Sequence, residues 1–166
     1  MSPHRILVAG LLTATIGNAL VSGVFLAFSS FIMPALARVS PESGVSVMQS
    51  INITVIRSLF LRLFFLTTLV SAMLVFAPAA RVPGPASWIA CVAGVVSVAG
   101  AFGVTMWLNV PLNDALAAAT PGSPAGGALW SAYLRDWTTA NHVRTAASAI
   151  ASALFLAALL LMRSES

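Results

Sequence analysis

TAASAIASALFLAALLLM, residues 145–162, decides the fold because it is a long apolar run without a charged side chain. A helix needs about 20 mainly apolar residues to cross a bilayer, at a rise of about 1.5 Å each. Directly before this run, TTANHVR (residues 138–144) places Asn141, His142 and Arg144 where the helix is expected to enter lipid. Polar side chains are costly at that depth, so these three residues call for an explanation.

Three further runs, residues 6–32, 59–77 and 88–108, are also long and apolar enough to span a membrane. The chain is 59% hydrophobic and only 7% charged, whereas a soluble domain has about 25% charged residues. The first run exceeds the apolar core of a signal peptide and is interrupted by Asn18 and Ser22, so we expect a retained helix. The sequence therefore predicts one multi-pass integral membrane domain over residues 1–166, an all-α bundle of four transmembrane helices.

The connections between these runs differ in length. Residues 78–87 form a short Pro/Gly-rich turn, whereas residues 33–58 and 109–144 are long. Because successive spans alternate in direction, both long connections are expected on one side of the membrane and both termini on the other. The termini side carries Arg5, Arg81 and Arg163, and the opposite side carries Arg38 and Arg135 if Arg57, Arg62 and Arg144 serve a site. With that count the positive-inside rule favours cytoplasmic termini, and we expect the plasma membrane.

The two long connections follow a related plan. Pro34 and Pro111 each lie at the end of a span, where a proline can start a new helix, and Pro111 is expected to break the third span. An Asn followed by an Arg then precedes the next span in both cases, which suggests two related helical hairpins. Small residues in the first and third spans have spacings that let helices approach closely: Gly10, Ala14, Gly17, Gly23, Ala90, Gly94, Ser97, Gly100 and Gly103.

Several classes of function are excluded by composition. The net charge is +4, but the arginines are scattered and form no basic patch, which argues against a nucleic-acid partner. Cys91 is the only cysteine and therefore cannot form an intramolecular disulfide. Only His4 and His142 are available as imidazole ligands, so we expect neither a metal site nor a cofactor, although a haem on a single histidine stays open.

Most polar side chains that can perform chemistry lie near one membrane face. On the last helix, Trp137, Asn141, Thr145, Ser148 and Ser152 form one stripe at intervals of three and four. Arg144 flanks this stripe, whereas His142 lies about 100° from Asn141 around the helix. For the nearby aromatic residues Trp107, Trp130, Tyr133 and Trp137 the simplest interpretation is interfacial anchoring, and for Asn113 and Asp114 it is helix capping.

At these residues the sequence resembles the anthrone oxygenase family. The resemblance rests on TMWLNVPLNDALAA (residues 105–118), on W…YLRDWTTANHVRTAAS (residues 130–148), and upstream on FSSFIMPAL and MQSINITVI with Gln49 and Asn52. It extends over about residues 10–160. Members are small membrane proteins, and fungal ones oxidise anthrones to anthraquinones with O2 in polyketide synthesis. The residues that match are Asn52, Asn109, Pro111, Asn113, Trp137, Asn141, His142 and Arg144.

The resemblance implies a membrane-bound, cofactor-independent oxygenase that converts an anthrone-like hydrophobic aromatic to a quinone. In this hypothesis His142 is the base, and Arg144 holds the developing oxyanion together with Asn141. Substrate-binding roles are expected for Asn52, Asn109, Asn113, Trp107 and Trp137. The alternative is a non-catalytic membrane protein that binds a small hydrophobic ligand or acts as an accessory subunit, with Asn141 and Arg144 tying the hairpins together. Homo-oligomerisation is compatible with both.

Overall fold

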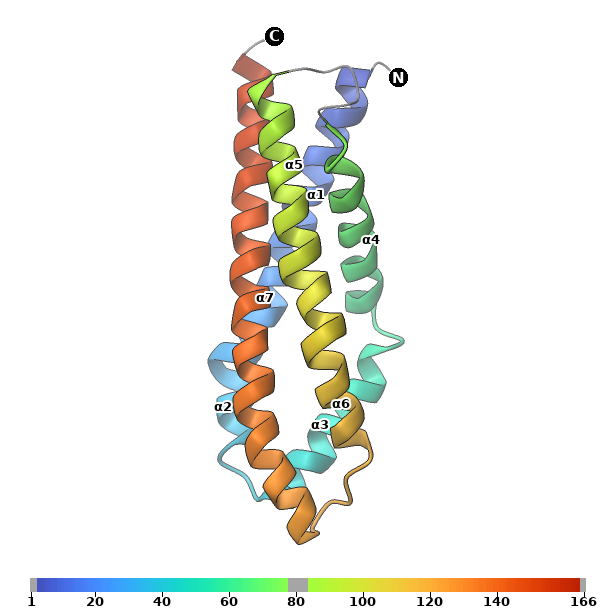
Figure 1. The fold of residues 1–166 in the computed structure, drawn as a ribbon, viewed down its shortest axis with the longest axis vertical. Coiled ribbons are helices and arrows are strands. Elements are labelled where there is room, and N and C mark those ends of the chain that lie inside the picture. The colour runs from blue at the N-terminus through green and yellow to red at the C-terminus, as the bar shows by residue number, and fades with distance from the viewer. Residues whose placement is uncertain (1–2, 78–83, 165–166) are drawn as a thin grey trace.

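The computed structural model describes residues 3–77 and 84–164, and all regular structure in these residues is helical. Four long helical runs lie side by side in these residues (Figure 1): α1 (Pro3–Ala27), α4 (Leu59–Leu74), the third long helix Pro85–Ala117, which begins with α5 (Pro85–Ser97), and α7 (Pro124–Ser164). Three shorter helices cover the end opposite the termini: α2 (Met33–Leu36), α3 (Pro41–Val55) and α6 (Val110–Ala117). The predicted all-α membrane class is confirmed.

Within residues 3–77 and 84–164, three helices are long and apolar enough to cross a membrane, namely His4–Leu36, Pro85–Ala117 and Pro124–Met162. A fourth crossing requires α3 and α4 together, which are bent by 59° at their junction. The predicted span 59–77 contains α4, whose 16 residues measure about 24 Å, less than the roughly 30 Å of hydrocarbon in a bilayer. Arg81 and the side chain of Arg163 lie outside the described residues, so the predicted orientation stays a prediction.

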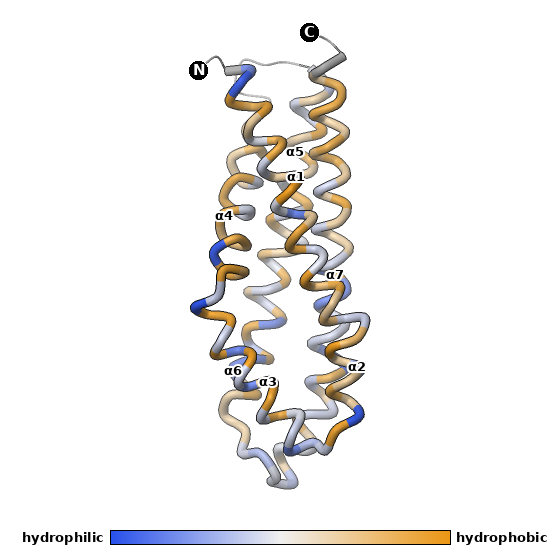
Figure 2. The backbone as a smooth tube through the Cα atoms, turned by 180° about the vertical axis from the view of Figure 1, so that it is seen from behind, coloured by the Kyte–Doolittle hydropathy of each residue, from blue (hydrophilic) through white to orange (hydrophobic). Residues whose placement is uncertain are grey.

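The hydropathy of the residues changes along the bundle, and the tube is less hydrophobic toward the end opposite the termini (Figure 2). On α7 the exposed residues Arg135, Asp136 and Thr139 give way to exposed Val143 and Ile150 toward the termini. This helix has 41 residues and measures about 60 Å, roughly twice the thickness of the hydrocarbon layer. The second long connection is therefore largely an extension of the last helix, and its polar outer face ends close to His142.

Pro34 and Pro111 lie in the first turn of α2 and α6, as predicted. The helical runs His4–Leu36 and Pro85–Ala117 nevertheless continue through them, so the predicted break at Pro111 is wrong. Each proline follows a π-helical segment, Phe28–Ile32 or Thr105–Asn109. The N–H of Met33 donates to the carbonyl of Phe28, and Val110 donates to Thr105, five residues back in each case. A proline clashes with the carbonyl four residues before it in a regular helix. A wider turn shifts the register and accommodates the ring.

Close contacts between helices depend on small residues. A Cβ on Gly94 would lie 2.5 Å from the carbonyl oxygen of Ser71, and a Cβ on Gly100 would collide with Ala147. The backbones of α4, α5 and α7 therefore approach closely, as expected where dispersion drives helix association. Asn18 adds a polar link in the middle of the bundle. Its Nδ2 donates to Ser71 Oγ at 3.2 Å, and its Oδ1 accepts from Ser97 Oγ at 2.8 Å.

Candidate functional site

One group of buried polar residues, Ser29, Asn109, Asn141 and Arg144, lies where the first long helix, the π-helical part of the third long helix and α7 meet. The predicted stripe on α7 faces this interior: Ser22 Oγ donates to the carbonyl of Thr145, and Ser152 Oγ donates to the carbonyl of Thr15. Asn141 is fully buried and Arg144 is 5% exposed. The cluster therefore lies inside the bundle, close to the level at which its outer surface becomes apolar.

Arg144 is the most unusual member of this cluster. Its Nη2 donates to Asn141 Oδ1 at 2.6 Å and its Nη1 donates to Thr105 Oγ1 at 3.3 Å. The guanidinium carbon lies 4.3 Å from the ring centre of Phe25 and 4.9 Å from that of Trp137. No acidic side chain among residues 3–77 and 84–164 pairs with it. Its partners orient the guanidinium but leave its positive charge uncompensated.

Asn141 connects Arg144 to the first helix. Its Nδ2 donates to the carbonyl oxygen of Phe25 at 2.7 Å and to Ser29 Oγ at 2.6 Å, while its Oδ1 accepts from Arg144. Ser29 belongs to the π-helical segment Phe28–Ile32. Because its amide nitrogen and its oxygen are both hydrogen-bonded, the Asn141 side chain is held in place and supports the guanidinium rigidly.

Aromatic residues form a second wall of the site. The rings of Trp130, Tyr133 and Trp137 stack on one another, with centroid separations of 5.7 and 6.1 Å. The Tyr133 hydroxyl and the Trp137 indole N–H both donate to Asn113 Oδ1, at 2.8 and 3.0 Å. These three aromatic residues are at most 5% exposed. The prediction of interfacial anchors is wrong for these three residues, because their rings are buried and the polar atoms of Tyr133 and Trp137 have partners inside the bundle.

Four buried polar atoms make no hydrogen bond within the described chain: Asn52 Nδ2, Asn109 Oδ1, Arg144 Nε and Ser148 Oγ. Buried polar groups are nearly always paired. The Asn109 Nδ2 donates to the carbonyl oxygen of Trp137 at 3.3 Å. The side chain of Asn52 lies beside the Tyr133 hydroxyl. The unpaired donors of Asn52 and Arg144 and the unpaired acceptor of Asn109 therefore lie near Tyr133 and Trp137. This arrangement suits a polar group on a flat ligand.

Gln49 explains how Asn52 reaches this region. The Gln49 Nε2 donates to the carbonyl oxygens of Leu116 at 2.8 Å and Ala119 at 2.9 Å. These bonds hold α3 against the end of α6. Asn52 follows three residues later, on the same face of α3. The Gln-x-x-Asn element therefore combines a clasp with a residue of the site.

Two of the predicted site residues lie elsewhere. His142 is exposed on the outer face of α7, and Trp107 is 78% exposed on the outer surface. The structure brings together the other six: Asn52, Asn109, Asn113, Trp137, Asn141 and Arg144. Within residues 3–77 and 84–164, no three His, Cys, Asp or Glu side chains meet at one point.

Three contacts of Arg144 and Asn141 were missed by the sequence reasoning. Phe25 and Ser29 lie four residues apart on the first long helix, but an apolar ring and a serine carry no distinctive signal there. Thr105 lies in the motif TMWLN, which drew attention to its tryptophan and asparagine instead. These three residues come from helices other than the one that carries Arg144.

The fold and this cluster define a small helical membrane protein with a buried polar site. The sequence profile of the anthrone oxygenase family matches residues 55–154. Because this is more than half of the chain, the protein belongs to the anthrone oxygenase family. The match supports a membrane oxygenase-like role in general, and it includes Asn109, Asn113, Trp137, Asn141 and Arg144. No curated protein and no solved structure matches the chain.

Proposed function

We propose that this protein is a membrane-bound, cofactor-independent oxygenase that oxidises an anthrone-like hydrophobic aromatic to a quinone with O2. The observation that carries the proposal is the buried guanidinium of Arg144, which no acidic side chain of the described chain neutralises. Burying an unpaired charge costs several kcal/mol. A bound anion offsets this cost, and the anion of a membrane-soluble aromatic supplies the opposite charge.

The chemistry requires a carbon acid whose anion is stabilised by the site. An anthrone loses a proton from the carbon opposite its carbonyl, and the negative charge moves to the enolate oxygen. Arg144 Nε and Asn52 Nδ2 are buried donors that are free to bind this oxygen. Asn109 Oδ1 is an acceptor for a hydroxyl group on the rings. The rings of Phe25 and Trp137 lie against the guanidinium, so an aromatic anion bound to Arg144 would have apolar neighbours.

The oxidation then balances without a further reagent. The electron-rich enolate transfers an electron directly to O2, and recombination forms a peroxide at the same carbon. Loss of water leaves the second carbonyl, so that one anthrone and one O2 give one anthraquinone and one H2O. Because His142 is exposed on the outer face of α7, we assign the first proton to water at the polar end of the bundle rather than to this imidazole.

The proposal is tested by oxygen consumption of the purified protein in lipid nanodiscs, with anthrone as substrate and with or without a chelator. We expect O2 uptake and anthraquinone formation in a one-to-one ratio that the chelator leaves unchanged. The alternative of a binding or accessory protein is supported if anthrones and hydroquinones bind but no O2 is consumed.

A matched pair of variants tests the assignment of Arg144. Arg144→Lys retains the charge but loses the planar fork, so we expect turnover to fall by about 10²-fold. Arg135→Lys makes the same chemical change at an exposed position of the same helix and is expected to leave turnover unchanged. Equal turnover of both variants contradicts the role of Arg144.

A further inference from the structure

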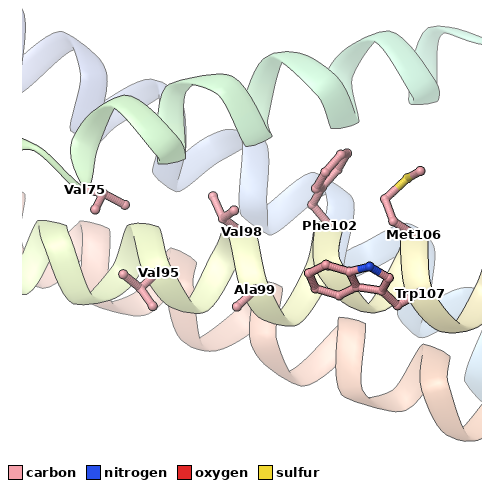
Figure 3. A pocket seen from close by; sticks show the side chains of 8 residues that line it. Val75, Val95, Val98, Ala99, Phe102, Met106 and Trp107 are labelled. Atoms are coloured by element: carbon pink, nitrogen blue, oxygen red, sulfur yellow. The ribbon is translucent and has the colours of Figure 1, made fainter.

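An apolar groove opens on the outer surface between α4 and α5 (Figure 3). Its volume is about 550 Å³. The third long helix supplies most of its wall, and Val75 at the end of α4 supplies the opposite side. Trp107 and Met106, which are 78% and 43% exposed, lie at one end of the groove. The remaining lining is Val95, Val98, Ala99, Phe102 and Gly103.

A series of packed aromatic rings links this groove to the surroundings of Arg144. Phe102 lines the groove and its ring centre lies 6.2 Å from that of Phe64, which in turn lies 5.9 Å from that of Phe25. Phe25 is the last ring in this series, and the guanidinium of Arg144 lies over it. Two aromatic side chains in series, Phe102 and then Phe64, therefore separate the groove from Phe25, the ring that lies against the buried cation.

The same part of the third long helix lines the groove and contacts Arg144. The π-helical segments Val98–Gly103 and Thr105–Asn109 carry the groove-lining Phe102 and Trp107 together with Thr105, which accepts from Arg144. Such wide turns occur frequently at functional sites. A Cβ on Gly103 would lie 2.9 Å from the Trp107 ring. Glycine at this position therefore allows the indole to lie along its own helix, with its ring on the groove.

We propose that this groove is the lateral port through which a flat, uncharged aromatic ring system passes from the bilayer toward Arg144. Trp107 offers a ring for stacking, and Phe102 with Phe64 forms the gate. The identity of the occupant rests on the proposed function. An acyl chain has neither a flat face for the indole nor an ionisable group for the guanidinium. A ring system that becomes an anion on deprotonation has both.

The test measures the rate at which anthraquinone associates with the purified protein in nanodiscs, followed by quenching of tryptophan fluorescence. Ala99→Phe fills the groove and is expected to slow association by about tenfold, and Val95→Phe serves as a second obstructing variant. Ala153→Phe makes the same change on the exposed face of α7 and should associate like the unmodified protein. Phe102→Ala removes half of the gate and should speed association.

Equal association rates for Ala99→Phe, Val95→Phe and Ala153→Phe overturn the proposal. It is also overturned if the obstructing variants only displace a copurified lipid and leave the anthraquinone rates unchanged. Anthraquinone is already oxidised and is not turned over. Failure of the oxygenase proposal would therefore leave this measurement intact, and failure of the port would leave turnover of the enzyme intact.

Discussion

At Arg144, aromatic faces and neutral acceptors take the place of a counter-ion. Two rings and the oxygens of Asn141 and Thr105 surround the guanidinium. Desolvated cation–π contacts contribute about 2 kcal/mol each, and hydrogen bonds to charged groups about 1.5–3 kcal/mol. A carboxylate would stabilise the arginine more strongly, but it would also cancel the field that a bound anion senses. The choice of neutral partners is what we expect of a binding site.

Asn141→Asp tests this interpretation directly. The carboxylate has the same shape as the carboxamide and lies against Arg144, so it neutralises the guanidinium. We expect turnover to fall by about 10²–10³-fold while the protein still folds, because the new ion pair offsets the lost donation to Phe25 and Ser29. Oxygen uptake and thermal unfolding measure the two effects. An active Asn141→Asp enzyme would show that the charge of Arg144 is not used.

His142→Ala distinguishes the base predicted from the sequence from the arrangement in the structure. The imidazole is exposed on the outer face of α7, and exposed substitutions usually change stability by less than about 0.5 kcal/mol. We expect turnover and melting temperature close to those of the unmodified protein, measured by the same assays. A loss of about 10²–10⁴-fold, the usual contribution of a general base, would instead restore His142 as the base.

At the scale of the helices, the close approach of α4 and α5 depends on Gly94. A Cβ at this position would lie 2.5 Å from Ser71 O and 2.8 Å from Val75 Cγ2. Gly94→Ala must therefore separate the two helices, and we expect a loss of about 1–3 kcal/mol in the free energy of unfolding. Thermal unfolding in nanodiscs measures the effect.

Gly23→Ala is the matched control for this prediction. A Cβ on Gly23 meets no atom within 4 Å, and alanine favours a helix over glycine by up to about 1 kcal/mol. We expect a melting temperature equal to or above that of the unmodified protein. If Gly94→Ala were equally stable, the packing of α4 against α5 would be looser than these contacts indicate.

For the whole molecule, the arrangement of the ends leads to a prediction about topology. Both termini lie at one end of the bundle, and α3 lies at the other (Figure 1). Ser46 in α3 is exposed, and Gly84 directly precedes α5. In a Cys91→Ala background, an impermeant maleimide applied to intact cells should label Ser46→Cys but not Gly84→Cys, because the positive-inside rule favours cytoplasmic termini. Labelling of both positions would contradict this topology, and labelling of Gly84→Cys alone would reverse the orientation.

Much of the architecture followed from the sequence alone. Long apolar runs determine a helical membrane protein because an isolated segment in lipid must satisfy its own backbone hydrogen bonds. Helical periodicity determined that Trp137, Asn141 and Arg144 share one side of the last helix, since the angle between residues of one helix is set by its geometry. The motifs around them also sufficed for the family, which the match over residues 55–154 confirms.

Only the tertiary structure decided which side of each helix faces a neighbour. It buried Tyr133 and exposed Trp107, although both aromatic residues lie near the same end of the bundle. It placed His142 on the exposed face of α7. It also brought Phe25 into contact with Arg144, although more than a hundred residues separate the two in the sequence. Periodicity sets the angles within a helix, but contacts between helices arise from the mutual fit of side chains and close backbone approaches. For that reason the site's polar stripe was predictable, whereas the aromatic and serine partners that complete it were decided by packing.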